Sequence, residues 1–235
     1  MSKTRKTKRE RNDESDRELS GYKMPWLVTM VPNRIYAGPF LRDQTDARYI
    51  VERLPVTHVI NMCPVSKETY KDGSSKATWY AKHWNARNDV ADEKAEERRA
   101  ALKPVMVREP IPDPNSSADA LSSQNETRQL TFFKGVAERT HAILAADPKA
   151  CVYIHHESGR GYEALVGFIT WGMLNRETCP RDVNAWCVAN DHRLILDTEE
   201  LRTMATKGIA QVVAAQKNPG LSQWVTITKR ARKTK

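Results

Sequence analysis

The sequence lacks the features that would place it in a membrane or in an oxidising compartment. No apolar run among its 235 residues approaches the roughly 20 residues that a helix needs to cross a bilayer. The basic start has no apolar stretch of the kind that a signal peptide carries. The four cysteines are scattered without paired spacing, which argues against a disulfide framework or a zinc ribbon. We therefore expect an intracellular protein, in the cytoplasm or the nucleus, that does not bind membranes.

A broadly basic body is missing as well, although the formal net charge is +9. Residues 1–11 and residues 229–235 each carry a net charge of +5, which leaves −1 for residues 12–228. The basic side chains at the two ends are Lys3, Arg5, Lys6, Lys8, Arg9, Arg11, Lys229, Arg230, Arg232, Lys233 and Lys235. This distribution excludes a broadly basic nucleic-acid-binding domain. It is compatible with solubilising tails and with electrostatic attachment to nucleic acid, an acidic partner or a nuclear import receptor.

The composition divides the chain into three parts. Residues 1–20 are almost all polar or charged and cannot bury enough apolar surface to become ordered. We expect a basic disordered tail over residues 1–23 and a second basic tail over residues 218–235. Between them, residues 24–217 have the apolar patterning of one domain. Within it, residues 86–103 are predicted to form a polar helical insertion that faces solvent.

Strand patterns and helix patterns alternate within this domain. The predicted strands cover residues 26–31, 34–38, 56–62, 105–107 and 151–154. The predicted helices cover residues 43–54, 124–146, 162–175, 180–190 and 197–215. The helix over 162–175 is apolar almost all round, so it is expected in the middle of the fold. The alternation predicts an α/β fold with a central, largely parallel sheet flanked by helices.

One junction joins a buried strand to this central helix through a short loop that contains glycine. The segment reads His155-His156-Glu157-Ser158-Gly159-Arg160-Gly161-Tyr162. In open α/β sheets ligands bind at the carboxyl ends of strands, and a helix N-terminus there offers N–H groups to an anion. A weak anion site at His156, Gly159 and Arg160 is one interpretation. The other is a plain turn that needs its glycines for geometry alone, beside a Glu157 carboxylate that disfavours phosphate.

Over residues 33–215 the chain resembles the dual-specificity branch of the cysteine-based protein phosphatases. The segments that carry the resemblance are Arg34-Ile35-Tyr36-Ala37-Gly38-Pro39-Phe40, Val56-Thr57-His58-Val59-Ile60-Asn61-Met62, Ile111-Pro112-Asp113 and the strand, loop and helix start from Val152 to Tyr162. That family's signature is H-C-x-x-G-x-x-R at the end of the central strand. Here His155 and Gly159 match the signature's His and Gly. His156 stands where the family has its nucleophilic Cys, and Tyr162 stands where it has its phosphate-binding Arg.

The resemblance implies a dual-specificity phosphatase-like fold with a degenerate site. The family's mechanism needs a thiolate, which an imidazole cannot supply, and a guanidinium that binds two phosphoryl oxygens, which a phenol cannot replace. We therefore expect a pseudophosphatase without catalytic residues, in which Asp113 is a vestigial general acid and His155 a structural residue bonded to the backbone. We expect no cofactor. We also expect no metal site, because consecutive strand residues such as His155 and His156 face opposite sides.

Three functions are compatible with these features. The first is a catalytically inactive binding or scaffolding protein, for a phosphorylated or acidic protein partner or as a structural component of a nucleoprotein or virion assembly. The second is a divergent active phosphatase that uses His156, with Arg160 in place of the lost Arg, or a shifted nucleophile. Cys63, at the end of the neighbouring strand, could lie close to the loop, but its favoured interpretation is a buried small apolar side chain. The third is a nucleic-acid-binding protein that acts through its basic tails, with binding that weakens steeply as salt is added.

Overall fold

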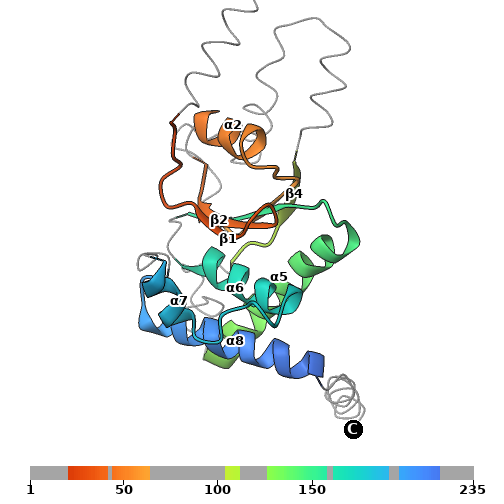
Figure 1. Ribbon diagram of the computed structural model, residues 1–235, viewed down its shortest axis with the longest axis vertical. Coiled ribbons are helices and arrows are strands. Elements are labelled where there is room, and N and C mark those ends of the chain that lie inside the picture. Colours follow the sequence, from red (N-terminus) through yellow and green to blue (C-terminus); the bar gives the residue numbers. More distant parts are fainter. Residues whose placement is uncertain are drawn as a thin grey trace, which may run out of the picture.

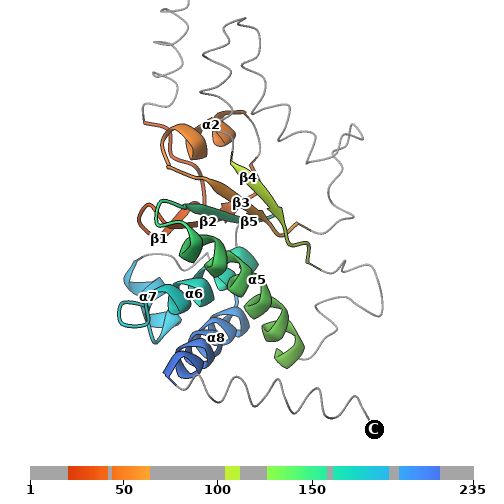
Figure 2. The same ribbon diagram turned by 90° about the vertical axis from the view of Figure 1, so that its right-hand side faces the viewer.

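In the described part of the chain, a five-stranded sheet forms the centre and helices cover both of its faces (Figure 1). The computed structural model describes residues 21–41, 44–63, 104–111, 126–157, 161–190 and 196–217. Helix α2 (Gln44–Glu52) lies on one face of the sheet, and the remaining helices lie on the other face in both views (Figure 2). These are α5 (Glu126–Ala146), α6 (Tyr162–Leu174), α7 (Val183–Ala189) and α8 (Glu199–Lys217). The predicted α/β fold class is confirmed.

The sheet is largely parallel, as the alternation of strands and helices predicts. Its strands lie in the order β1-β2-β5-β3-β4. Their bounds are β1 Val28–Val31, β2 Ile35–Pro39, β3 His58–Asn61, β4 Val105–Arg108 and β5 Val152–His156. Strand β5 is the central strand and pairs in parallel with β2 and β3, while β3 pairs in parallel with β4. Strand β1 pairs with β2 in the antiparallel sense.

The turn between β1 and β2 explains how these two strands come to be antiparallel. Asn33 has a backbone φ of 57°, in the left-handed region that Asn tolerates better than most residues. The Arg34 N–H donates a hydrogen bond to the Val31 carbonyl oxygen at 3.0 Å and closes the turn. The first predicted strand therefore keeps its place but begins at Val28 rather than at Trp26.

Helix α6 is the central helix of the fold. Every residue from Glu163 to Gly172 is buried, which confirms the position expected from its apolar sequence. It packs against the sheet on one side and against α8 on the other. The contact between α6 and α8 is close at Gly208. A Cβ atom at this position would lie 2.7 Å from the side chain of Ile169, nearer than real Cβ contacts allow. The absence of a side chain at Gly208 is therefore what lets the two helices approach.

Arg34 connects the start of β2 to the end of α5 and the turn that leads into β5. Its guanidinium donates to four main-chain carbonyl groups, those of Leu144, Asp147, Pro148 and Ala150. Carbonyl groups in the last turn of a helix have no partner within the helix, and a cation stabilises that end. Arg34 thus fixes the position of α5 relative to the central strand.

The part of the chain predicted to be the N-terminal tail contacts the domain at its last residues. The Tyr22 hydroxyl donates a hydrogen bond to the Asp46 carboxylate on α2, and its ring meets the ring of Tyr49 edge-on at 5.5 Å. Residues 1–20, the predicted insertion over 86–103 and the predicted tail over 218–235 lie outside the described residues.

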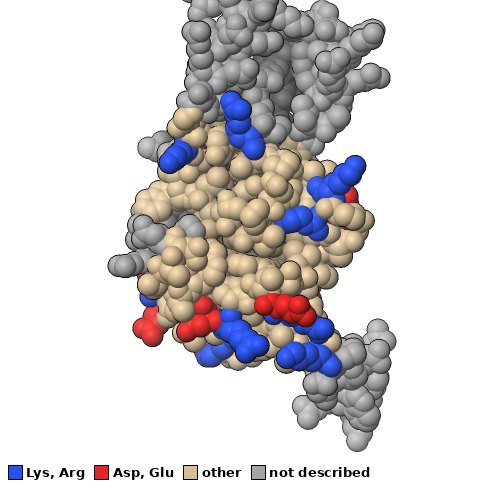
Figure 3. Space-filling model, viewed as in Figure 1, with Lys and Arg blue, Asp and Glu red and all other residues tan. Residues whose placement is uncertain are grey.

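The described surface carries charge of both signs. On the face shown in Figure 3, basic and acidic side chains lie next to one another over the end of the molecule that α7 and α8 form. This mixture agrees with the net charge of −1 over residues 12–228. Within the ranges that the structure describes, no helix is long and apolar enough to cross a membrane.

Candidate functional site

The carboxyl ends of three neighbouring strands meet at the candidate site. On β5, His155 is paired with Gly38 of β2 on one side and with Asn61 of β3 on the other. The Met62 N–H, just past β3, donates to the His155 carbonyl oxygen at 2.9 Å. Past the end of β4, the Ile111 N–H donates to the Met62 carbonyl oxygen at 3.2 Å. This arrangement is the one in which open α/β sheets bind ligands.

His155 is a fully buried residue on the α2 side of the sheet. Its ring lies edge-on to Phe40 at 5.6 Å and stacks on Tyr153 at 5.9 Å. Its Nδ1 lies 3.8 Å from the Sγ atom of Cys63. These surroundings are those of a core histidine and do not expose the imidazole to a substrate.

Cys63 lies beside His155 at the start of the candidate loop and is fully buried, as expected for a small apolar side chain. Its N–H donates to the Asn61 Oδ1 atom at 2.9 Å, and this bond holds the chain in place just past β3. A phosphoryl group would have to enter the core to reach the Cys63 thiol. The burial argues against Cys63 as a shifted nucleophile.

His156 and Tyr162 stand at the two ends of the loop, and their side chains meet. The two rings lie edge to face, with centroids 5.5 Å apart and an angle of 78° between their planes. Tyr162 in turn stacks on Phe133 of α5, with centroids 5.1 Å apart. Such aromatic pairs contribute about 0.5–1.5 kcal/mol beyond their buried area. The two positions that the family uses for chemistry are here part of an aromatic cluster, His156–Tyr162–Phe133.

The surroundings of Tyr162 are apolar and negatively charged. Burial raises the pKa of the Tyr162 hydroxyl, and the carboxylates of Glu200 and Asp197 raise this pKa further. Both carboxylates are exposed: Glu200 lies in the first turn of α8, and Asp197 lies two residues before this helix. Glu157, just past β5, is exposed as well. Tyr162 therefore stays a neutral phenol near neutral pH and can donate a single hydrogen bond.

Glu163 belongs to this site, and sequence reasoning missed it. It is fully buried, and its Oε1 atom accepts a hydrogen bond of 2.9 Å from the Gly161 N–H. Its Oε2 atom is also buried and has no hydrogen-bond partner. Burial raises the pKa of Glu163 to about 7, and Asp197 adds to the rise. The signal that could have identified it is that Glu163 is the one charged residue of α6.

Gly161 precedes α6 and sets the distance between the loop and α8. A Cβ at this position would lie 2.7 Å from Leu201 Cδ1. Its φ of 179° is ordinary extended backbone, so space and not conformation requires the glycine. The close contact brings the acidic start of α8 to the loop.

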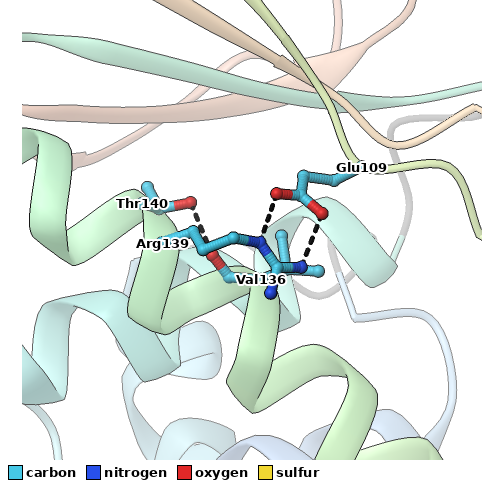
Figure 4. A network of polar contacts seen from close by, with 4 residues as sticks. All are labelled: Glu109, Val136, Arg139 and Thr140. Atoms are coloured by element: carbon cyan, nitrogen blue, oxygen red, sulfur yellow. Dashed lines mark hydrogen bonds and ion pairs between the residues drawn. The ribbon is translucent and has the colours of Figure 1, made fainter.

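The predicted general-acid loop leaves the sheet at the same edge as the β5–α6 loop. The chain is placed up to Ile111, which is buried, and Asp113 lies outside the described residues. Just before it, Glu109 forms a two-pronged ion pair with Arg139 of α5 (Figure 4). The Arg139 side chain is 55% exposed, so the pair contributes at most about 1 kcal/mol and serves mainly to orient this segment.

Of the predicted anion site, the structure describes only His156. Ser158, Gly159 and Arg160 lie outside the described residues. Among the side chains that are described, no group of three or more His, Cys, Asp or Glu residues could hold a metal ion. The described part of the site is thus an aromatic cluster with a buried carboxyl group and an acidic rim.

No family model matches the chain, and no curated protein matches it. Several solved structures are similar to the chain. A crystal structure of PTPMT1 is similar with 16% identity and a TM-score of 0.43, over 79% of this chain and 96% of that one. Tk-PTP in the active form is similar with 13% identity and a TM-score of 0.44, over 82% of this chain and 99% of that one.

The core catalytic domain of the PP-IP phosphatase SIW14 from S. cerevisiae, in complex with citrate, is a third similar structure. It has 11% identity and a TM-score of 0.43, over 84% of this chain and 95% of that one. All three TM-scores lie below 0.5, so these similarities do not establish the fold of this chain. The fold class of this chain rests on the strand order and register described above.

Proposed function

We infer that this chain is a binding or scaffolding protein built on a dual-specificity phosphatase-like domain, and that it does not hydrolyse phosphate monoesters. The main observation that supports the proposal is the edge-to-face contact of the His156 and Tyr162 rings, whose centroids lie 5.5 Å apart. In the family that the sequence resembles, these two positions hold the nucleophile and the phosphate-binding guanidinium. Here they hold rings that pack against each other.

The chemistry of the two replacements supports the proposal. A cysteine nucleophile acts as a thiolate, and its loss removes the covalent route that the family uses. A guanidinium donates two parallel hydrogen bonds to phosphoryl oxygens, whereas Tyr162 has one hydroxyl. Loss of one transition-state donor typically lowers a rate by about 10²–10³. Loss of the donor and the nucleophile together leaves no equivalent pathway.

The charge around the loop supports it as well. An active loop for phosphate monoesters needs positive charge where the substrate's negative charge develops. The described carboxyl groups here are those of Glu157, Glu163, Asp197 and Glu200. Their field opposes the binding of a dianion, and it does so most strongly where solvent is excluded.

The experiment is a turnover assay on the purified full-length chain with a small aryl phosphate and with phosphopeptides. We expect a rate of hydrolysis no higher than that of a control reaction without protein. His141→Ala, at a partly exposed histidine of α5, is the matched control for His156→Ala. Turnover that His156→Ala or Cys63→Ala abolishes and His141→Ala preserves would overturn the proposal and support a divergent phosphatase.

The partner that suits this chain is an acidic protein bound through the charged ends. The two end segments carry +5 each, against −1 for the rest of the chain. Pull-downs that compare the full chain with chains lacking residues 1–20 or 218–235 test this role. Capture that survives both deletions would place recognition on the domain. Retention of nucleic acid with a steep dependence on salt would point instead to the nucleic-acid-binding alternative.

A further inference from the structure

A carboxyl group of the chain itself occupies the start of α6. A helix N-terminus has N–H groups without partners inside the helix and therefore attracts negative charge. At α6 the Gly161 N–H donates to Glu163 Oε1 at 2.9 Å. The carboxyl group reaches back from the first turn of the helix to the residue before it. It therefore occupies a donor that a bound oxyanion would otherwise use.

A second observation separates this contact from an ordinary helix cap. Capping side chains are usually exposed at helix ends, and both of their oxygens can contact water. Glu163 is fully buried, and its Oε2 atom has no hydrogen-bond partner. A buried carboxyl oxygen without a donor is costly, so the site holds a group that its surroundings satisfy only in part.

We propose that Glu163 is a specificity-determining residue, a tethered carboxyl group that fills the anion position at the start of α6 and keeps external oxyanions out. This inference rests on the proposal that the loop is not catalytic, and it names the residue that decides what the start of α6 can bind. The excluded ligand class is sulfate, phosphate and phosphate monoesters. Loss of the charge on Glu163, by substitution or by protonation, removes the repulsion that keeps these anions away from the start of α6.

The other charged and titratable groups around the site do not compensate for Glu163. Asp197, just before α8, and Glu200, in its first turn, add negative charge, and Tyr162 is neutral. Arg202 on α8 donates to the Leu196 carbonyl oxygen at 2.6 Å. His156, across the ring of Tyr162, and the exposed Glu157 complete the set of described groups. Of these groups, His156 is the histidine, and its variant therefore serves as a control in the pH series below.

The test uses inorganic sulfate, because its charge stays at −2 from about pH 5 to about pH 8. Sulfate binding to the full-length chain is measured by titration calorimetry at constant ionic strength. At about pH 8, Glu163→Gln is expected to bind sulfate at least about tenfold more tightly than wild type, since one nearby negative charge is removed. Glu177→Gln, at an exposed glutamate after α6, is the matched control and should behave as wild type.

Wild-type protein gives a second measurement that needs no variant. Its sulfate affinity should rise as the pH falls from about 8 to about 6, and the advantage of Glu163→Gln should shrink in parallel. Equal sulfate affinity of wild type and Glu163→Gln at about pH 8, or no binding by either, would overturn the proposal. So would a pH-dependent rise that His156→Gln abolishes and Glu163→Gln leaves unchanged.

The outcome is separable from that of the turnover assay. Sulfate binding reports on the anion position alone, whereas turnover reports on a nucleophile. Turnover by wild type would end the non-catalytic proposal whatever sulfate does. A failed sulfate experiment would leave the absence of turnover intact.

Discussion

Replacement of Glu163 by Gln should change how the stability of the fold depends on pH. Glu163 is fully buried, and burial raises its pKa from 4.5 to about 7. A carboxyl group whose pKa is higher in the folded protein holds its proton more tightly there than in the unfolded chain. Its contribution to stability is therefore complete below its unfolded pKa of 4.5, and it is lost as the pH rises to about 7.

The size of the effect follows from the shift. A pKa that moves from 4.5 to about 7 corresponds to roughly 3 kcal/mol, at 1.36 kcal/mol per unit. Between about pH 4.5 and about pH 8, wild type should lose roughly this amount of unfolding free energy relative to Glu163→Gln. The two proteins share every other titrating group. Any constant cost of burying an amide at this position cancels in the comparison across pH.

The assay is urea unfolding, followed by far-UV circular dichroism, for both proteins at several pH values in this range. Glu177→Gln is again the control, because Glu177 is exposed, and its stability should follow that of wild type. A difference between Glu163→Gln and wild type that stays constant from about pH 4.5 to about pH 8 would refute the reasoning. It would show that Glu163 does not titrate in a buried environment.

Three further predictions concern the scaffold and the loop. Arg34→Met removes four hydrogen bonds to carbonyl groups at the end of α5 and in the turn that leads into β5, and it should cost about 2–4 kcal/mol of unfolding free energy in urea; a loss below about 0.5 kcal/mol would contradict this role. Gly208→Ala should destabilise by about 1–3 kcal/mol because its Cβ would lie 2.7 Å from the Ile169 side chain. Gly135→Ala is the control, because its Cβ would lie 3.4 Å from Arg139 Nη1, close to an ordinary contact distance, and it should be neutral or stabilising in the same assay. His156→Cys and Tyr162→Arg, combined with Glu163→Gln to remove the carboxylate at the start of α6, should bring tungstate binding, measured by calorimetry; a folded triple variant that binds no oxyanion would show that the loop has diverged beyond recognition as a former active site.

The layered fold was predictable because its strands and helices have strong local signals. The apolar run after Tyr162 requires a buried helix, and Val59 and Ile60 mark a buried strand, which is β3. Helix bounds agree with prediction to within three residues. The first strand was placed two residues early, because Trp26 has a positive φ of 61° that an apolar pattern does not reveal.

The site was less predictable, because its contacts join residues that are distant in the sequence. The residue types at His156 and Tyr162 could be read directly, but the stacking of Tyr162 on Phe133 depends on how α5 packs. The proximity of Cys63 to His155 depends on the pairing of β3 with β5. Glu163 was overlooked because a single charge within an apolar run hardly alters the pattern, although its burial alters the chemistry.

The most direct test of the central claim is a search for a phosphoenzyme. The full-length chain is incubated with an aryl phosphate, quenched in alkali, in which phosphohistidine survives, and analysed by mass spectrometry of its peptides. Because His156, which stands where the family that the sequence resembles has its nucleophile, packs against Tyr162, we expect no phosphorylated residue in any peptide. Phosphate on His156, present in wild type and absent when the substrate is omitted, would contradict the account.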